Sequence, residues 1–190
     1  MERVLRWMAA AAVLAAPALA QNAISARAGM INVADGEVFL VDANGGAPLR
    51  VEPKPSELIE VKEGQILKTA EGRSEVLLTP GAFLRIGEES SFKLIGNRLS
   101  DVRLEVLSGS ILVEVVELLD GNSLTVLAKH SATSVLKPGI YRFDADPGRI
   151  RVYQGEARVQ IDGAAQTLKG SRELVASAGG WSAGRRPRRR

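Results

Sequence analysis

The sequence VLSGSILVEV, residues 106–115, reads as two short β-strands that meet at a glycine. Apolar side chains alternate with polar ones around Gly109, and a period of two residues is typical of half-buried strands. An apolar or β-branched residue three positions before a glycine recurs along the chain. The glycines of this pattern are Gly36, Gly64, Gly81, Gly109, Gly139, Gly155 and Gly170.

The spacing between these glycines is uneven, so they mark corners between strands and not copies of a whole module. Glycine suits tight hairpin turns and bulges because a positive φ costs it little. We therefore predict that all seven are structural turn glycines.

Short segments rich in apolar and β-branched residues lie between the corners. They are 37–41, 74–78, 82–86, 101–107, 123–130, 140–145, 149–153 and 156–161. Turn dipeptides such as Asp120-Gly121 separate them, and the sequence has no long amphipathic helical pattern. Strands at this density predict an all-β fold, with many short strands joined by glycine turns and packed as a solenoid, roll or sandwich.

The first twenty residues have the composition of a secretory signal peptide. Arg3 and Arg6 precede the apolar run MAAAAVLAA, and the small residues Ala18 and Ala20 on either side of Leu19 suit a signal peptidase. The run is shorter than the ~20 residues that span a bilayer, which favours cleavage over an uncleaved anchor. We expect cleavage near Ala20 and Gln21, and a periplasmic or secreted mature protein.

Charge is unevenly distributed along the chain. Residues 21–184 carry 18 basic and 21 acidic side chains, whereas the chain ends in RRPRRR. The acidic body argues against a nucleic-acid-binding domain, so no nucleic-acid partner is expected. We expect a folded unit over 28–175 and a disordered tail over 176–190, because the tail has little apolar surface to bury. The tail arginines either lie in solvent or contact an anionic membrane surface; they are Arg185, Arg186, Arg188, Arg189 and Arg190.

Few residues suggest catalysis or cofactor binding. The chain has no Cys, and its one histidine, His130, lies at a predicted strand end away from any nucleophile motif, which favours a surface or turn residue. Asp144 and Asp146 could offer oxygens to Ca²⁺, but acids beside Pro-Gly favour a turn. Glu114 and Glu117 point to opposite faces if both lie on one strand. We predict no catalytic residue, no metal site and no cofactor.

Two further groups have competing interpretations. Tyr141 and Phe143 share a strand face and could form an aromatic binding strip with Tyr153. Because the chain has only eight aromatic residues, core packing is the favoured interpretation. The segment EESS at 88–91 reads as a polar hairpin tip.

Five segments, taken together, resemble the FecR domain, the periplasmic part of iron-dicitrate-type transmembrane sensors. They are LIEVKEGQILKTAEGRSEVLLTPGAFLRIGEESSFKL (58–94), LEVLSGSILVEV (104–115), ATSVLKPGIYRFDAD (132–146), IRVYQGEARVQ (150–160) and TLKGSREL (167–174). The shared motifs are structural: a glycine before ILKT, a PG turn, GS opening a strand, and a glycine-led strand ending in an aromatic residue. The resemblance implies an all-β, solenoid-like packing of short strands.

The chain departs from the family at two points. Gly139-Ile140 stands where members commonly have Gly-Thr before the strand aromatic. Sensor members also carry a membrane-spanning helix before the domain, where this chain is expected to have a cleaved signal peptide. The resemblance therefore implies the scaffold and a protein partner, without the step that passes a signal to a cytoplasmic sigma factor.

These observations lead to the hypothesis of a non-enzymatic, exported FecR-like β scaffold that engages an envelope protein or polymer. Open folds of short strands leave sheet edges, and main-chain hydrogen bonds at an edge can hold an added strand of the partner. The alternative is a cell-envelope enzyme acting on polysaccharide, which would need a pocket with paired carboxylates.

Overall fold

The computed structural model describes residues 27–52, 58–177 and 180–184. Within these residues the chain forms strands and turns without a helix, so the prediction of an all-β fold is confirmed. No helix in this part of the chain is long and apolar enough to cross a membrane. The predicted signal peptide, residues 1–20, lies outside the described residues.

Fifteen strands are present in the described part of the chain. The first eight are β1 (Met30–Val41), β2 (Leu49–Arg50), β3 (Ile66–Thr79), β4 (Ala82–Ile86), β5 (Ser91–Arg98), β6 (Asp101–Ser108), β7 (Ser110–Val115) and β8 (Leu124–Ala128). The others are β9 (Ser131–Val135), β10 (Gly139–Asp144), β11 (Arg149–Gln154), β12 (Glu156–Ile161), β13 (Ala164–Lys169), β14 (Arg172–Ser177) and β15 (Gly180–Gly184).

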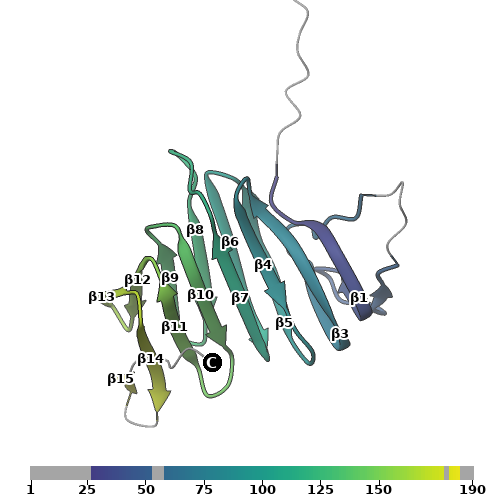
Figure 1. Cartoon of the computed structure of the whole chain (residues 1–190). Helices are drawn as coiled ribbons and strands as arrows, with labels where there is room; N and C mark the ends of the chain where they lie inside the picture. The colour runs from purple at the N-terminus through teal and green to yellow at the C-terminus, as the bar shows by residue number, and fades with distance from the viewer. Residues whose placement is uncertain (1–26, 53–57, 178–179, 185–190) are drawn as a thin grey trace, which may run out of the picture.

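All the strands belong to one sheet, which curls into two facing layers (Figure 1). The first layer has the order β13-β12-β9-β8-β6-β5, and the second has the order β4-β7-β10-β11-β14-β15. β3 joins the two layers, and β1 pairs with β3 along most of its length. Strand pairs are antiparallel except for β6 and β8, which are parallel.

The long strand β3 belongs to both layers because its two ends have different neighbours. Its first residues, Ile66 to Lys68, pair with β5, and residues from Ser74 onwards pair with β4. The strand bends between these parts at Gly72, which pairs with Gly36 of β1 next to a β-bulge. A Cβ at Gly72 would lie 2.5 Å from the backbone nitrogen of Glu37, so only glycine lets the two bent strands approach this closely.

Beyond β3 the chain alternates between the layers, mostly one hairpin at a time. The pairs β5–β6, β8–β9 and β12–β13 lie in the first layer, and β10–β11 and β14–β15 lie in the second. Between β6 and β7 the crossover is the single residue Gly109, and between β11 and β12 it is Gly155. The stretch VLSGSILVEV, residues 106–115, therefore contains a crossover from the first layer to the second.

Neighbouring crossovers pack backbone against backbone. A Cβ at Gly139 would overlap the carbonyl group of Gln154, and one at Gly155 would overlap the hydroxyl of Tyr141. That hydroxyl donates a hydrogen bond to the carbonyl of Lys137 and accepts one from the backbone nitrogen of Glu156, 3.1 Å away. Burial raises the pKa of Tyr141, and hydrogen bonding with the backbone of Glu156 and Lys137 opposes the shift. From inside the core, Tyr141 thus links the crossover before β10 to the crossover between β11 and β12.

Five of the seven predicted turn glycines have a positive φ, between 64° and 95°: Gly36, Gly64, Gly81, Gly109 and Gly155. Gly36 lies in the bulge of β1 and not in a hairpin. Gly139 and Gly170 have ordinary φ values. At Gly139 the close approach of the neighbouring crossover, and not the backbone dihedral, accounts for glycine.

A single hydrophobic core fills the space between the layers. In strands such as β7, β8 and β11 the side chains alternate between this core and the outer face, as the period of two predicts. Among the largest fully buried side chains, the first layer contributes Phe92, Leu94 and Leu104, and the second contributes Leu84, Tyr141 and Phe143.

Ordered structure extends beyond residue 175, where the sequence led us to expect a disordered tail over 176–190. β15 pairs with β14 in register, with Ala176 opposite Trp181 and Glu173 opposite Gly184. Trp181 is half-buried and packs against the core. The composition of this segment did not indicate a strand, because main-chain hydrogen bonds to β14 and the packing of one indole ring hold β15 in place. Residues 185–190 lie outside the described residues.

We predict that Gly139→Ala destabilises the protein by about 1–3 kcal/mol, because the added methyl group must displace the backbone of residues 154 and 155. The matched control is Gly87→Ala, since Gly87 also has an ordinary φ and an added Cβ there meets no atom within 4 Å. Urea unfolding of both variants measures the difference. Equal midpoints would show that the crossovers tolerate side chains between them.

Candidate functional site

A row of mostly charged side chains crosses the solvent face of the second layer. The residues lie directly opposite one another on successive strands β3, β4, β7, β10, β11 and β14: Glu75, Arg85, Leu112, Arg142, Arg151 and Glu173. Each alternates along its strand with core residues, as Arg85 does between Leu84 and Ile86. The sheet register therefore gathers arginines from three strands on one face.

Arg85 lies between two carboxylates. Its Nε donates to Glu75 over 2.8 Å, and its Nη1 donates to Glu114. The hydrogen bond to Glu114 is the main cause of a raised pKa of Arg85, and the bond to Glu75 adds to it. The side chain is still 43% exposed, so water screens this network and remains in contact with it.

A second network joins Arg142 and Arg151 through Asp144. Asp144 is buried, and its two oxygens accept from Arg142 Nε at 2.7 Å and from Arg151 Nη1 at 3.1 Å. Arg151 also donates to Glu173 over 3.0 Å. Burial lowers the pKa of Arg151, but the hydrogen bond to Glu173 and the charge of Asp144 outweigh it, and the pKa is raised. Arg142 completes its contacts by donating to Ser110 Oγ at 3.1 Å.

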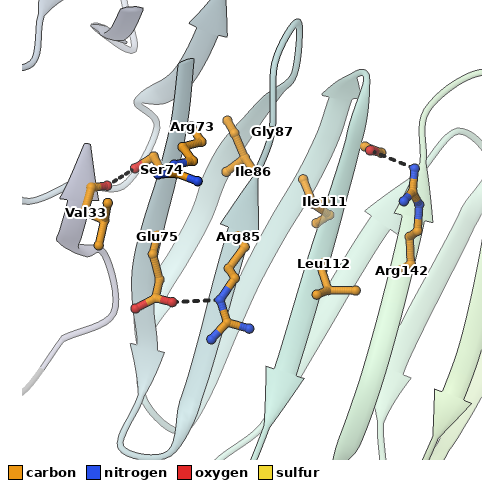
Figure 2. A pocket seen from close by; sticks show the side chains of 11 residues that line it. Val33, Arg73, Ser74, Glu75, Arg85, Ile86, Gly87, Ile111, Leu112 and Arg142 are labelled. Carbon is orange, nitrogen blue, oxygen red and sulfur yellow. Dashed lines mark hydrogen bonds and ion pairs between the residues drawn. The ribbon is translucent and has the colours of Figure 1, made fainter. Parts of the chain in front are cut away.

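These networks border a hollow of about 550 Å³, which we call the arginine hollow (Figure 2). Its apolar lining comes from Val33, Ile86, Ile111 and Leu112, and its polar lining includes Arg73, Arg85 and Arg142. The hollow forms beside the end of β4 at Ile86, where the chain leaves the second layer for the first. At Ile86 the pairing of β4 with β3 and with β7 ends.

The arginine hollow can hold a partly apolar ligand and donate hydrogen bonds to it. Within the described residues, Arg85 uses Nε and Nη1, and Arg142 uses Nε and Nη2. The remaining guanidinium nitrogen of each keeps its N–H groups for a ligand oxygen. Because their carboxylate partners hold both side chains in place, little rotamer entropy is lost when a ligand binds.

The acidic candidates from the sequence do not converge on one site. Glu114 contacts Arg85 in the second layer, whereas Glu117 lies beyond the end of β7. Asp144 is buried in the arginine network, and Asp146 is exposed and pairs with Lys129 over 3.4 Å. No three His, Cys, Asp or Glu side chains come together as a metal site in the part of the chain that the structure describes.

The other candidates also lie apart from the arginine hollow. His130 is exposed in the turn between β8 and β9. Tyr141 and Phe143 are fully buried in the core, which is the interpretation that the sequence favoured over a binding strip, and Tyr153 is half-buried on β11. The segment 88–91 connects β4 to β5, and its two serines are buried, unlike the polar hairpin tip that we expected.

The tail arginines, Arg185, Arg186, Arg188, Arg189 and Arg190, lie outside the described residues. The arginines that do line a hollow were not candidates from the sequence. Their signal was present in AFLRI and IYRFD, where an arginine alternates with apolar residues and must therefore point to solvent. That signal does not tell which outward arginines become neighbours.

Comparisons with known proteins support the fold. Neither a family model nor a curated protein matches the sequence. Two crystal structures of a "putative anti-sigma factor" from Parabacteroides distasonis ATCC 8503 are similar, with a TM-score of 0.54 at 15% identity and 0.55 at 12% identity. The matches cover 63% and 64% of this chain, and 58% and 59% of those chains. The chain thus matches less than two thirds of their length, and at these identities the likeness shows the fold alone.

We predict that Arg85→Met destabilises the protein by about 1 kcal/mol, because Glu75 and Glu114 then face each other without a cation between them. Adding Glu114→Gln should recover part of the loss. Arg103→Met is the control, since Arg103 and Asp101 form an exposed pair that contributes little. Urea unfolding of the four proteins tests this, and an equal cost at Arg85 and Arg103 would contradict it.

Proposed function

We propose that the chain is an exported, non-enzymatic binding module of the FecR-like type, which engages a protein in the cell envelope. The all-β fold with its alternating layers, and its similarity to crystal structures described as anti-sigma factors, support a regulatory or binding role. The short segments that resemble the FecR domain, such as 58–94 and 104–115, coincide with strands and crossovers of this fold.

The open edge of the first layer is the observation that carries this proposal. β13 pairs with β12 along its whole length and ends the strand order, so within the described residues no strand covers its other side. Five of its six residues are exposed, and the strand AAQTLK contains no proline or inward-pointing charge and only one charged residue, Lys169 at its end. Edge strands usually carry such devices against pairing. An added strand of a partner would satisfy the outward N–H and C=O groups of β13.

The enzyme alternative has less support from the arrangement of carboxylates. A glycoside hydrolase needs two carboxyl groups that face a substrate, one of them able to give up a proton. The carboxylates beside the arginine hollow, Glu75 and Glu114, are both hydrogen-bonded to Arg85. They neutralise a guanidinium, which suits a binding surface better than acid–base chemistry.

The route out of the cytoplasm is part of the proposal. The arginines at the start, the apolar run and the small residues Ala18 and Ala20 support export with cleavage before Gln21. Amino-terminal sequencing of the protein from the envelope fraction should therefore begin at or near Gln21. A membrane-embedded form that keeps Met1 would contradict this.

Proline substitutions in β13 test the edge. In an antiparallel strand the N–H groups of consecutive residues alternate between the paired side and the open side, so one of Gln166 and Thr167 points its N–H outward. Proline at the outward position should leave the melting temperature nearly unchanged, whereas proline at the inward position removes a ladder hydrogen bond and lowers it.

The binding measurement uses both proline variants beside the unaltered protein. Each is used to capture proteins from an envelope extract, and the retained proteins are identified by mass spectrometry. We expect a partner that the unaltered protein retains and the outward-proline variant loses. Retention of the same proteins by the outward-proline variant would show that the edge of β13 is not the binding element.

A further inference from the structure

A second hollow adjoins the arginine hollow at the bend of the sheet. It has a volume of about 510 Å³ and is lined by Asp35, Glu71, Glu88 and Arg73, with the backbone of Gly36, Gly72 and Gly87 between them. We call it the acidic hollow. Arg73 and Gly87 line both hollows, so the two meet at these residues.

The two hollows carry opposite charge. Three acidic side chains and one arginine line the acidic hollow, whereas three arginines and one glutamate line the arginine hollow. The hollows meet at Arg73, and the apolar side chains of Val33, Ile86 and Ile111 line the arginine hollow beside it. The surface therefore runs from a mainly acidic hollow, past Arg73, to a hollow whose lining is apolar and basic.

Gly87 stands where the hollows meet, although nothing in the fold requires glycine there. Its φ is ordinary, and an added Cβ would meet no atom within 4 Å. This differs from Gly36 and Gly72, where the opposing backbone leaves no room for a side chain. A glycine in open space lets a ligand backbone approach the surface closely.

We propose that the two hollows together bind an extended peptide segment of a protein partner. The segment has a basic side chain at the acidic hollow, apolar side chains over Ile86 and Ile111, and an acidic side chain at the arginine hollow. The proposal rests on the binding function proposed above for the class of partner, and it names a surface different from the edge of β13.

The dimensions agree with a short segment. From β3 to β10 the arginine hollow spans three strand spacings of about 4.8 Å, or about 14 Å, which about four residues of extended chain can cross. The acidic hollow on the other side of Arg73 lengthens the path further. A segment with one charged residue near each end and a few apolar residues between them fits this path.

A peptide fits the charges better than a small anion does. Arg73, Arg85 and Arg142 are each ion-paired already, with Asp35, with Glu75 and Glu114, and with Asp144. An anion with several charges would meet these carboxylates next to every guanidinium. A single carboxylate on a peptide can instead accept from one free N–H group while its basic residue lies near Asp35, Glu71 and Glu88.

The test pans a display library of random peptides, longer than this span, against the immobilised protein. We expect enrichment of peptides with a basic residue and an acidic residue separated by a short apolar run. A Gly87→Trp variant fills the junction without disturbing the backbone, and it should weaken binding of the enriched peptides by at least about tenfold. Gln160→Trp is the matched control, because Gln160 is exposed on β12 in the first layer.

A charge reversal tests the acidic hollow separately. Glu88 is exposed, and its carboxylate forms no hydrogen bond or ion pair within the described residues, so Glu88→Lys should keep the melting temperature of the protein. Peptides enriched on Glu88→Lys should lose the preference for a basic residue. If they keep it, the acidic hollow does not recognise that residue and the proposed order of charges is wrong.

Three other outcomes would overturn the inference. Enriched peptides that bind Gly87→Trp as well as the unaltered protein would place the binding site elsewhere, and enriched peptides lost on Gln160→Trp would point to the first layer. No enrichment above background would show that the hollows do not take extended peptides. The proposed binding function would survive each of these results if the proline variants of β13 still separate retained from lost partners.

Discussion

The close contact of backbone with backbone at the crossovers is the constraint on which the structure depends. At several places where the chain passes from one layer to the other, it lies against a neighbouring stretch of backbone with no room for a side chain. Gly139 against Gln154 and Gly72 against Glu37 are two such contacts. Because these contacts fix where each hairpin enters its layer, they also fix the register of the strands, and with it the order of side chains across each face.

The row on the second layer is a direct consequence of that register. Glu75, Arg85 and Arg142 are far apart in sequence, and they share a face because β3, β4, β7 and β10 are aligned residue by residue. The hollow beside them has the same origin, since β4 must stop at Ile86 for the chain to reach β5 in the other layer. The crossover that follows β4 therefore accounts for the arginine hollow, and the strand register accounts for the arginines that line it.

The sequence predicted the strands that alternate strongly and missed those that do not. AFLRI coincides with β4, and EARVQI coincides with β12, because apolar and polar residues alternate in both. SATSV in β9 and GWSAG in β15 have no such alternation. These strands are held by main-chain hydrogen bonds to neighbours that the local sequence does not reveal.

The candidate site was less predictable than the fold for a related reason. Local alternation indicates that Arg85 and Arg142 face solvent, but their proximity depends on two strand registers and on the crossover at Gly109. Asp144, which the sequence offered as a possible Ca²⁺ ligand, instead accepts hydrogen bonds from Arg142 and Arg151. The sequence candidates for catalysis do not converge on one site, whereas the proposed binding surface consists of paired charges around an apolar lining.

The two proposed binding surfaces lie in different parts of the sheet, which has a consequence for how the module could work. β13 ends the first layer, and five strands of that layer separate it from β3, beside which the hollows lie. A strand added at β13 would therefore not cover Gly87, and a peptide in the hollows would leave the β13 edge open. One surface is part of a continuous hydrogen-bonded ladder, and ion pairs between neighbouring strands hold the side chains of the other. A scaffold of this kind can hold two segments of one partner, or one segment from each of two partners, without changing shape. Its contribution to recognition is then the fixed separation between an edge and a groove, and this separation is set by the number of strands between them.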